Sequence, residues 1–222
     1  EASEMAYFGS EILHPRTVEP LREKHIPVNI YNVKDYAQWP LPKSMINGEE
    51  SITEGIIKGI SFSDDFGIVR IKGAGVGVKP GILARITSLL DQQRINIKSV
   101  LTSQIAINLL IEKSKASKVE EILNRAELHG IEEIILNDDI SVIAAIGEGL
   151  IQYHGLASKI FNSVADKGIN VEMICFGASS VAVYFVVKTA DKNDTVQALY
   201  CTLFGKQSSN LKTSNHYEYS TT

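Results

Sequence analysis

The sequence contains GILARI at residues 81–86 and a similar GLASKI at residues 155–160, an offset of 74 residues. Two further pairs of segments fall at the same offset without a gap: Ile95-Asn96-Ile97 with Ile169-Asn170-Val171, and Ser63-Asp64-Asp65 with Asn137-Asp138-Asp139. Three matches at one spacing indicate an internal repeat, in which one supersecondary unit is present twice.

Each copy of the repeat predicts the element order strand, helix, strand, strand, helix. Apolar residues recur at 82, 83, 86, 89 and 90, which is typical of a helix with one buried face. The first copy predicts strands at 68–71, 95–101, 105–111 and 131–136 and a second helix at 116–128. The second copy predicts strands at 141–146, 171–176 and 181–187 and a second helix at 192–204.

The second copy has no closing strand of its own, because the chain turns polar after Phe204. A spare strand is predicted at 55–62, before the first copy. An unpaired sheet edge is unfavourable, so we expect this strand to close the second sheet and the first unit to be inserted within the second. The fold class predicted is α+β, with two ferredoxin-like βαββαβ domains whose antiparallel sheets carry helices on one face.

The predicted domain bounds follow from this nesting. The first domain covers 66–137, the second covers 55–63 plus 138–205, and a polar tail covers 206–222. Residues 1–50 lie outside the repeat and predict two helices, at 2–8 and 17–24, and a strand at 27–32.

Composition excludes several classes of function. The chain has 222 residues, of which 44% are hydrophobic and 22% charged, with a net charge of -4 and no long basic block. It therefore predicts no nucleic-acid partner, which would need a basic surface for the phosphates. No apolar run reaches the length of a membrane helix, about eighteen residues or more, so no membrane partner is predicted. Two cysteines, Cys175 and Cys201, make neither a disulfide framework nor a metal cluster, and they favour a cytoplasmic location.

The residues show no catalytic or metal-binding set. The glycine-rich loop 73–81 fits neither G-x-G-x-x-G nor the Walker spacing, which leaves a structural turn or a small-anion site at a helix N-terminus. The acid pairs Asp64-Asp65 and Asp138-Asp139 could form a catalytic dyad, but their equivalent places at strand starts favour turns. The histidines have no metal-ligand spacing, and only His154 occupies a loop that could face a ligand.

Several segments resemble a known family. Residues 5–17 (MAYFGSEILHPRT) resemble the E-x-A-x-x-G-A-x-x-L-H-P segment near the end of the aspartate kinase catalytic domain, and His25-Ile26-Pro27-Val28 is similar to the strand that follows it. Residues 173–180 (MICFGASS) are similar to a strand and loop of the second ACT domain in lysine-sensitive, monofunctional aspartate kinases. The two copies of the repeat resemble the tandem ACT domains of the same enzymes.

The resemblance implies an identity for each part. Residues 1–50 would be the C-terminal end of an α/β amino-acid kinase domain, and the rest would be its feedback-sensing region. The parent enzyme phosphorylates the side-chain carboxylate of aspartate with ATP and Mg²⁺, on the route to lysine, threonine and methionine. Its catalytic lysine motif would lie N-terminal to Glu1, so we expect an excised piece without catalytic residues or a cofactor. A homodimer through the ACT domains is also implied.

The resemblance also implies an effector site in the first ACT domain, with lysine or threonine as the ligand. Helix N-terminal N–H groups near Gly81 and Ile82 suit an amino-acid carboxylate. The implied effector-binding residues are Val76, Val78, Lys79, Gly81, Ile82, Asn96, Ile97, Lys98, Ser103 and Gln104.

This sequence departs from the lysine-binding members at two of these positions. Those members have Asp where Lys98 stands and an acid where Gln104 stands, and a lysine at 98 would repel a cationic effector. Threonine is therefore favoured over lysine, and loss of sensing is a third possibility. Two alternatives from other classes remain: a stand-alone amino-acid-binding module and a purely structural dimerisation unit.

Overall fold

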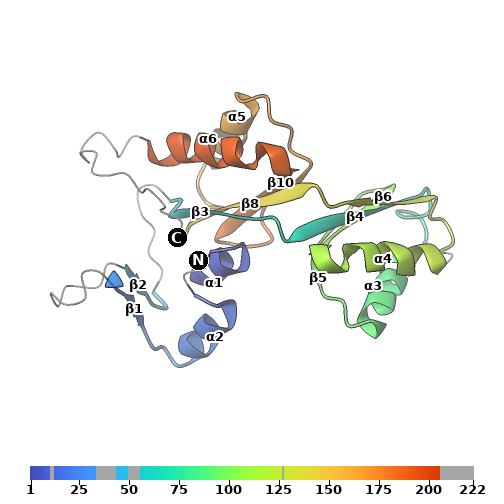
Figure 1. Cartoon of the computed structure of the whole chain (residues 1–222), viewed down its shortest axis with the longest axis horizontal. Coiled ribbons are helices and arrows are strands. Elements are labelled where there is room, and N and C mark those ends of the chain that lie inside the picture. The colour runs from blue at the N-terminus through green and yellow to red at the C-terminus, as the bar shows by residue number, and fades with distance from the viewer. Residues whose placement is uncertain (11–12, 34–43, 50–55, 127, 206–222) are drawn as a thin grey trace, which may run out of the picture.

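The computed structural model describes residues 1–10, 13–33, 44–49, 56–126 and 128–205. Within these ranges the structure has three sheets and the helices that cover two of them (Figure 1). The helices are α1 (Ala2–Tyr7), α2 (Pro15–Glu23), α3 (Ile82–Gln92), α4 (Lys113–Arg125), α5 (Leu156–Ala165) and α6 (Lys192–Phe204), with a 3-10 turn at Thr189–Asp191. The strands are β1 (Val28–Ile30), β2 (Ser44–Ile46), β3 (Gly59–Ser63), β4 (Phe66–Lys72), β5 (Ile97–Thr102), β6 (Ala106–Glu112), β7 (Glu133–Asn137), β8 (Ile140–Ile146), β9 (Met173–Cys175) and β10 (Ala182–Lys188).

The first copy of the repeat forms a sheet in the order β5-β6-β4-β7, and all of its pairs are antiparallel. Helices α3 and α4 cover one face, because Ile86 and Leu90 of α3 and Val119 of α4 pack with Val69 and Ile71 of β4 in one buried cluster. The periodic apolar residues of the sequence therefore lie on the buried side of α3, as predicted.

The second copy forms a sheet in the order β3-β8-β10-β9. Strand β3 precedes the first copy in the chain and pairs antiparallel with β8, from Gly59 opposite Ile146 to Ser63 opposite Val142. The strand expected at 55–62 thus closes the second sheet, although residue 55 lies outside the described residues. Both sheets are antiparallel with helices on one face, so the predicted α+β fold with two ferredoxin-like units is confirmed.

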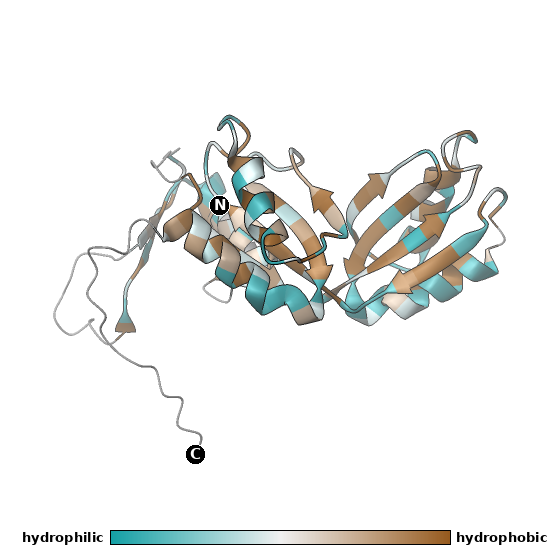
Figure 2. Ribbon diagram, turned by 90° about the horizontal axis from the view of Figure 1, so that it is seen from above, coloured by the Kyte–Doolittle hydropathy of each residue, from teal (hydrophilic) through white to brown (hydrophobic). Residues whose placement is uncertain are grey.

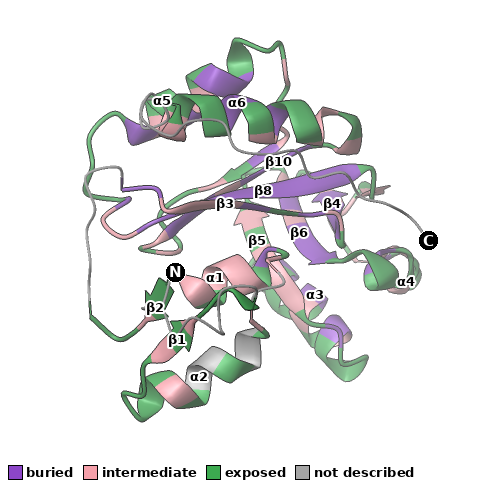
Figure 3. Ribbon diagram, turned by 60° about the vertical axis from the view of Figure 1, so that its left-hand side comes forward, coloured by how far each residue is buried: buried purple, intermediate pink, exposed green. Residues whose placement is uncertain are grey.

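The two sheets pack against each other through the faces that the helices leave free. A shared cluster contains Ile68 of β4, Leu110 of β6 and Val142 and Ala144 of β8, with Phe8 from the N-terminal segment. Strand β8 lies at the centre of this arrangement and is buried along its whole length (Figure 3). The strands of both sheets are mostly hydrophobic in Figure 2, as expected of strands that are covered on two faces.

Helix α1 is fastened to the second unit by polar contacts. The Glu1 carboxylate accepts hydrogen bonds from Lys58 (2.9 Å) and from the Glu148 N–H (2.6 Å). The Glu4 carboxylate accepts one from the Ser179 hydroxyl (2.9 Å), and the Ser61 hydroxyl donates to the Phe8 carbonyl (2.8 Å). Residues 1–8 are therefore part of the same packed body as the second unit.

The chain crosses between the two units twice, at 63–65 and 137–139. Each crossing contains a local turn: the Asp65 N–H donates to Ser63 Oγ, and the Asp139 N–H donates to Asn137 Oδ1. These bonds form the turns that we expected at the two acid pairs. Asp64 also binds across the junction, since its carboxylate accepts from Lys192 and from the Ser141 hydroxyl, both at 2.5 Å.

Asp64 makes the stability of this junction depend on pH. Partial burial alone would raise the pKa of Asp64, but the hydrogen bonds from Lys192 and Ser141 outweigh burial and lower it below the usual 3.8. Its contribution to stability is therefore present above the unfolded pKa and is lost as the pH falls through the lower folded value. We expect the urea midpoint to fall less in Asp64→Asn than in the wild type between pH about 5 and about 2.5. Replacement of the exposed Asp91 by asparagine is the control and should follow the wild type; the same slope in all three chains would contradict the assignment.

Candidate functional site

The glycine-rich loop between β4 and α3 lies flat against two neighbouring turns. The Gly73 N–H donates to the Ile105 carbonyl (3.0 Å), the Gly75 N–H to the Gly130 carbonyl (3.2 Å) and the Gly77 N–H to the Gln104 carbonyl (2.9 Å). A Cβ atom at Gly73 would lie 2.1 Å from the Gly130 oxygen, and one at Gly77 would lie 2.7 Å from the Gln104 oxygen. Glycine is required at these positions because backbone meets backbone there.

The same arrangement recurs in the second unit. Gly147, the repeat partner of Gly73, would place a Cβ atom 1.8 Å from the Ile56 carbonyl oxygen. Gly81 and Gly155, which precede α3 and α5, both have positive φ values, of 85° and 80°. The two loops therefore share their backbone geometry, but Leu150 in the second loop is fully buried in its core while its counterpart Val76 is only half-buried.

Helix α3 begins beside an open cavity. Gly81 has no side chain to cap the helix, and a Cβ atom at this position would meet nothing within 4 Å. The first N–H groups of a helix have no partner within it, so they remain available to a ligand. The cavity has a volume of ≈ 590 Å³, and its lining residues are Val76, Gly77, Lys79, Gly81, Ile82, Leu83, Thr102, Ser103, Gln104 and Ile107.

Six of the ten residues implied by the resemblance line this cavity, and they come from the loop, the start of α3 and the turn after β5. Lys79 is the only ionisable side chain among the lining residues, and none of them is a carboxylate. Gly77, Leu83, Thr102 and Ile107 also line it and were not predicted. Of these, Gly77, Leu83 and Thr102 are each next to a predicted position in the sequence, so the spacing alone could have found them.

Four of the ten residues do not line the cavity. Val78 is 78% exposed, Asn96 is exposed, and Ile97 packs against the core of the first unit. Lys98 turns away from the cavity, because its ammonium lies 4.9 Å from the centre of the Tyr7 ring on α1. Their roles in effector binding stay predictions.

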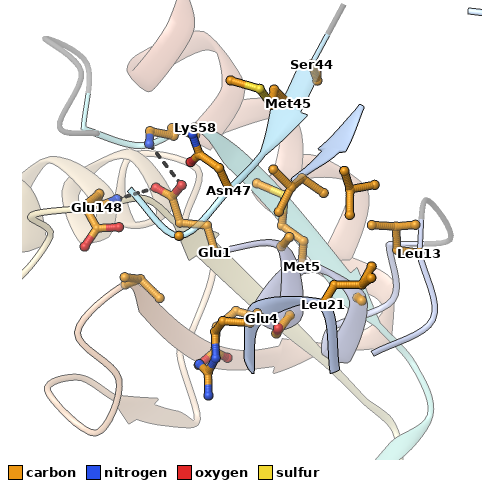
Figure 4. A pocket seen from close by; sticks show the side chains of 18 of the residues that line it. Glu1, Glu4, Met5, Leu13, Leu21, Ser44, Met45, Asn47, Lys58 and Glu148 are labelled. Atoms are coloured by element: carbon orange, nitrogen blue, oxygen red, sulfur yellow. Dashed lines mark hydrogen bonds and ion pairs between the residues drawn. The ribbon is translucent and has the colours of Figure 1, made fainter. Parts of the chain in front are cut away.

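A second and larger cavity lies between the N-terminal segment and the second unit (Figure 4). Its volume is ≈ 1030 Å³, and its walls come from α1, α2, the β1–β2 pair and the loop 178–181. Glu1 spans one side of it, toward Lys58 and the backbone of Glu148, as the dashed lines in Figure 4 show. This cavity has no signal in the sequence, since strand β2 has only three residues and was not predicted.

The remaining candidates from the sequence are the histidines, cysteines and acidic residues. Among the residues that the structure describes, no three His, Cys, Asp or Glu side chains come together as a metal site. His154 is exposed, and Cys175 is half-buried against Tyr184. No helix in the described ranges is long and apolar enough to span a membrane.

The fold and the loop-to-helix cavity define a class of protein. The ACT domain family matches residues 61–125 and again residues 143–203. The chain therefore belongs to the ACT-domain proteins and contains two such domains, which we call ACT1 (around the β4–β7 sheet) and ACT2 (around the β8–β10 sheet).

Comparison with whole proteins shows that, among ACT-domain proteins, this chain corresponds to the regulatory region of aspartokinases. The chain is 32% identical over 213 residues to Aspartokinase 1, chloroplastic, of Arabidopsis thaliana, covering 92% of this chain and 36% of that one. It is 26% identical over 242 residues to the aspartokinase of Saccharomyces cerevisiae, covering 99% of this chain and 45% of that one. Aspartate kinase of Clostridium acetobutylicum superposes with a TM-score of 0.82 at 25% identity, covering 91% of this chain and 47% of that one. The chain thus spans less than half the length of these relatives.

Proposed function

We propose that this chain is the feedback-sensing part of an aspartate kinase and that the ACT1 cavity binds an amino acid with an uncharged side chain, of which threonine is the best fit. The observation that carries this proposal is the charge of the cavity. A helix N-terminus and one cation, Lys79, suit the effector carboxylate. The lining residues offer no carboxylate to receive the second ammonium group of lysine, and an unpaired charge in a cavity is unfavourable.

The proposed position of the ligand follows from the polar groups that remain. The Ser103 hydroxyl is already engaged with the Ala106 backbone, at 3.1 Å from its N–H. The side chains of Thr102 and Gln104, which come from a different segment than Lys79, offer oxygens to an α-ammonium group. The effector would then lie with its carboxylate toward α3 and its ammonium toward the end of β5.

A second copy of the chain is the partner that these surroundings support. Val78, Leu83, Val100 and Ile105 are large apolar residues that are exposed on or beside the cavity, at 78%, 39%, 38% and 65%. Strand β5 is also an edge strand, so its outer side is free to pair. We propose a homodimer in which ACT1 of each chain covers the ACT1 cavity of the other.

The whole enzyme would use ATP and Mg²⁺ to phosphorylate aspartate, with an end product as its inhibitor. The relatives are aspartokinases, and the kinase of Clostridium acetobutylicum is an allosteric enzyme. The ATP and Mg²⁺ site would lie outside residues 1–222, and no catalytic step is assigned to these residues. A cytoplasmic location is likewise a proposal, since several plant relatives are chloroplastic.

Titration calorimetry on this chain tests the effector. We expect threonine to bind, lysine to bind more weakly or not at all, and Lys79→Met to lower the affinity for threonine by about tenfold or more, because a hydrogen bond to a charged group is lost. Lys115→Met is the control, since Lys115 is exposed on α4 far along the chain from the loop. Tighter binding of lysine than of threonine, or an equal loss in both variants, would overturn the assignment. No heat with any amino acid would favour a purely structural dimerisation unit.

A further inference from the structure

Strand β5 contains a bulge at Lys98. Ile97 lies opposite Ile111 of β6 and Ser99 lies opposite Leu110, so Lys98 is an extra residue without an opposite partner. A bulge redirects side chains relative to the regular alternation of a strand. Lys98 accordingly reaches the face of the ACT1 sheet that is free of helices, where its ammonium lies over the Tyr7 ring.

The Tyr7 ring lies in an aromatic group between the two sheets. It stacks on Phe66 of β4 (6.3 Å between centroids) and meets Phe8 edge to face (5.1 Å). Phe8 in turn lies 5.0 Å from Tyr184 of ACT2. An ammonium over such a ring is attracted by the negative face of the ring. Tyr7 therefore joins α1 to ACT1, whereas the carboxylates of Glu1, just before α1, and Glu4 bind ACT2.

The next residue of β5, Ser99, also makes a contact outside its own domain. Ser99 contacts the hydroxyl of Tyr184, whose pKa is raised by burial and by the neighbouring Cys175. Two consecutive residues at the start of β5 thus contact α1 and ACT2. The other end of the same strand, Thr102, lines the effector cavity. Thr102 lies four residue steps along the strand from Lys98, about 13 Å at roughly 3.3 Å per step.

From this arrangement we infer that the Lys98–Tyr7 contact transmits the state of the ACT1 cavity to the N-terminal segment. The inference rests on the proposed function for its ligand but not for the contact itself. A ligand that contacts Thr102 and Gln104 would act on the end of β5, and the pairing of β5 with β6 runs without a break from Thr102 back to Ser99, next to Lys98. A displacement of the strand would reach α1 where Lys98 meets Tyr7. Lys98 would then be a positioning residue for regulation and would not touch the effector.

A double-mutant cycle tests the contact without any ligand. The readout is amide hydrogen exchange of Met5 and Phe8, whose N–H groups donate to the Glu1 and Glu4 carbonyls and so close the two ends of α1. We expect Lys98→Met to raise the opening constant of α1 about two- to fivefold, and to have no further effect when Tyr7→Leu is already present. Lys98→Arg should restore protection, because a guanidinium also stacks on the ring.

Lys159→Met is the matched control. The Lys159 ammonium lies 5.7 Å from the centre of the Tyr153 ring within ACT2, and this contact does not involve α1. Its replacement should leave the exchange of α1 unchanged. An effect of Lys98→Met that is equal in the wild-type and Tyr7→Leu backgrounds, or that Lys159→Met reproduces, would overturn the contact.

Adding saturating threonine separates the contact from the ligand. Threonine should change the exchange of α1 in the wild-type chain by more than in Lys98→Met, while calorimetry shows that both chains bind it. An equal change in both chains would overturn the transmission role. Absence of binding to either chain would overturn the proposed effector, and the cycle would still decide whether Lys98 holds α1.

Discussion

Replacing Phe8 by alanine is expected to lower the free energy of unfolding by about 3–5 kcal/mol. Phe8 is only 2% exposed and packs in the cluster shared by the two sheets, against residues of both ACT domains. Removing its ring would leave a cavity that neither sheet can fill, because the Ser61–Phe8 hydrogen bond and the Glu1 and Glu4 contacts hold the helix in place. Urea-induced unfolding, followed by circular dichroism, measures the change.

Phe176→Ala provides the comparison for this loss. Phe176 is 43% exposed and follows the edge strand β9, so its removal should cost less than about 1 kcal/mol. The result also separates two hypotheses about the N-terminal segment. A stand-alone module would tolerate loss of the segment, and an equally small effect of Phe8→Ala would support that alternative. A large effect limited to Phe8→Ala means that α1 completes the core between the ACT domains.

The fold could be predicted because the repeat and the missing strand constrained each other. The offset of 74 residues indicated the element order of both units, and the unpaired edge of the second sheet required a strand from elsewhere. Strand β3 fills that edge and extends one residue beyond the predicted end, at Ser63. Element ends were less accurate, as at α4. This helix begins at Lys113 rather than at the first apolar residue, Ala116, because its first N–H donates to the Asp65 carbonyl.

The position of Lys98 could not be predicted from alternation along the strand. In a regular strand, the face of the sheet on which residue 98 lies would follow from that of Ile97, because side chains alternate. The bulge inserts Lys98 as an extra residue and shifts the pairing of the residues that follow by one position. The feature that creates this bulge is a backbone register, which depends on the partner strand and leaves no local signal in the sequence. The contacts of Glu1 and Glu4 could not be predicted either, since both residues bind partners more than 50 positions away in the sequence.

The loop of the candidate site was the part best predicted from local sequence. Its glycines indicated a turn, and the helix after Gly81 indicated free N–H groups. The sequence could not decide between a structural turn and an anion site. In the structure Gly73, Gly75 and Gly77 donate their N–H groups within the protein, as a structural turn requires. The start of α3 faces the cavity, and an anion site there stays a prediction.

The second large effect is expected for Gly73→Ala. The new Cβ atom would lie 2.1 Å from the Gly130 oxygen and 2.8 Å from the Ile131 Cα, both backbone atoms that cannot rotate away. The loop would have to lift from the 129–131 turn, breaking the hydrogen bond from Gly75 to Gly130. We expect the free energy of unfolding to fall by about 3 kcal/mol, the upper end of the usual range for overpacking, and threonine binding to be lost. Urea unfolding and calorimetry on the same sample measure the two effects.

Gly81→Ala at the other end of the loop shows whether a steric clash or backbone strain is responsible. Gly81 has a φ of 85° but open space around it, so an alanine there would cost only the strain of a left-handed residue, about 1–2 kcal/mol. Its effect on binding should be modest if the effector carboxylate lies against the N–H groups that follow, since the methyl group meets no neighbour. A Gly73→Ala chain that retains both its stability and its affinity would mean that the loop can move off the Gly130 turn freely. In that case the cavity would not be shaped by the close approach of these glycines, and Lys79 would not be held beside the start of α3.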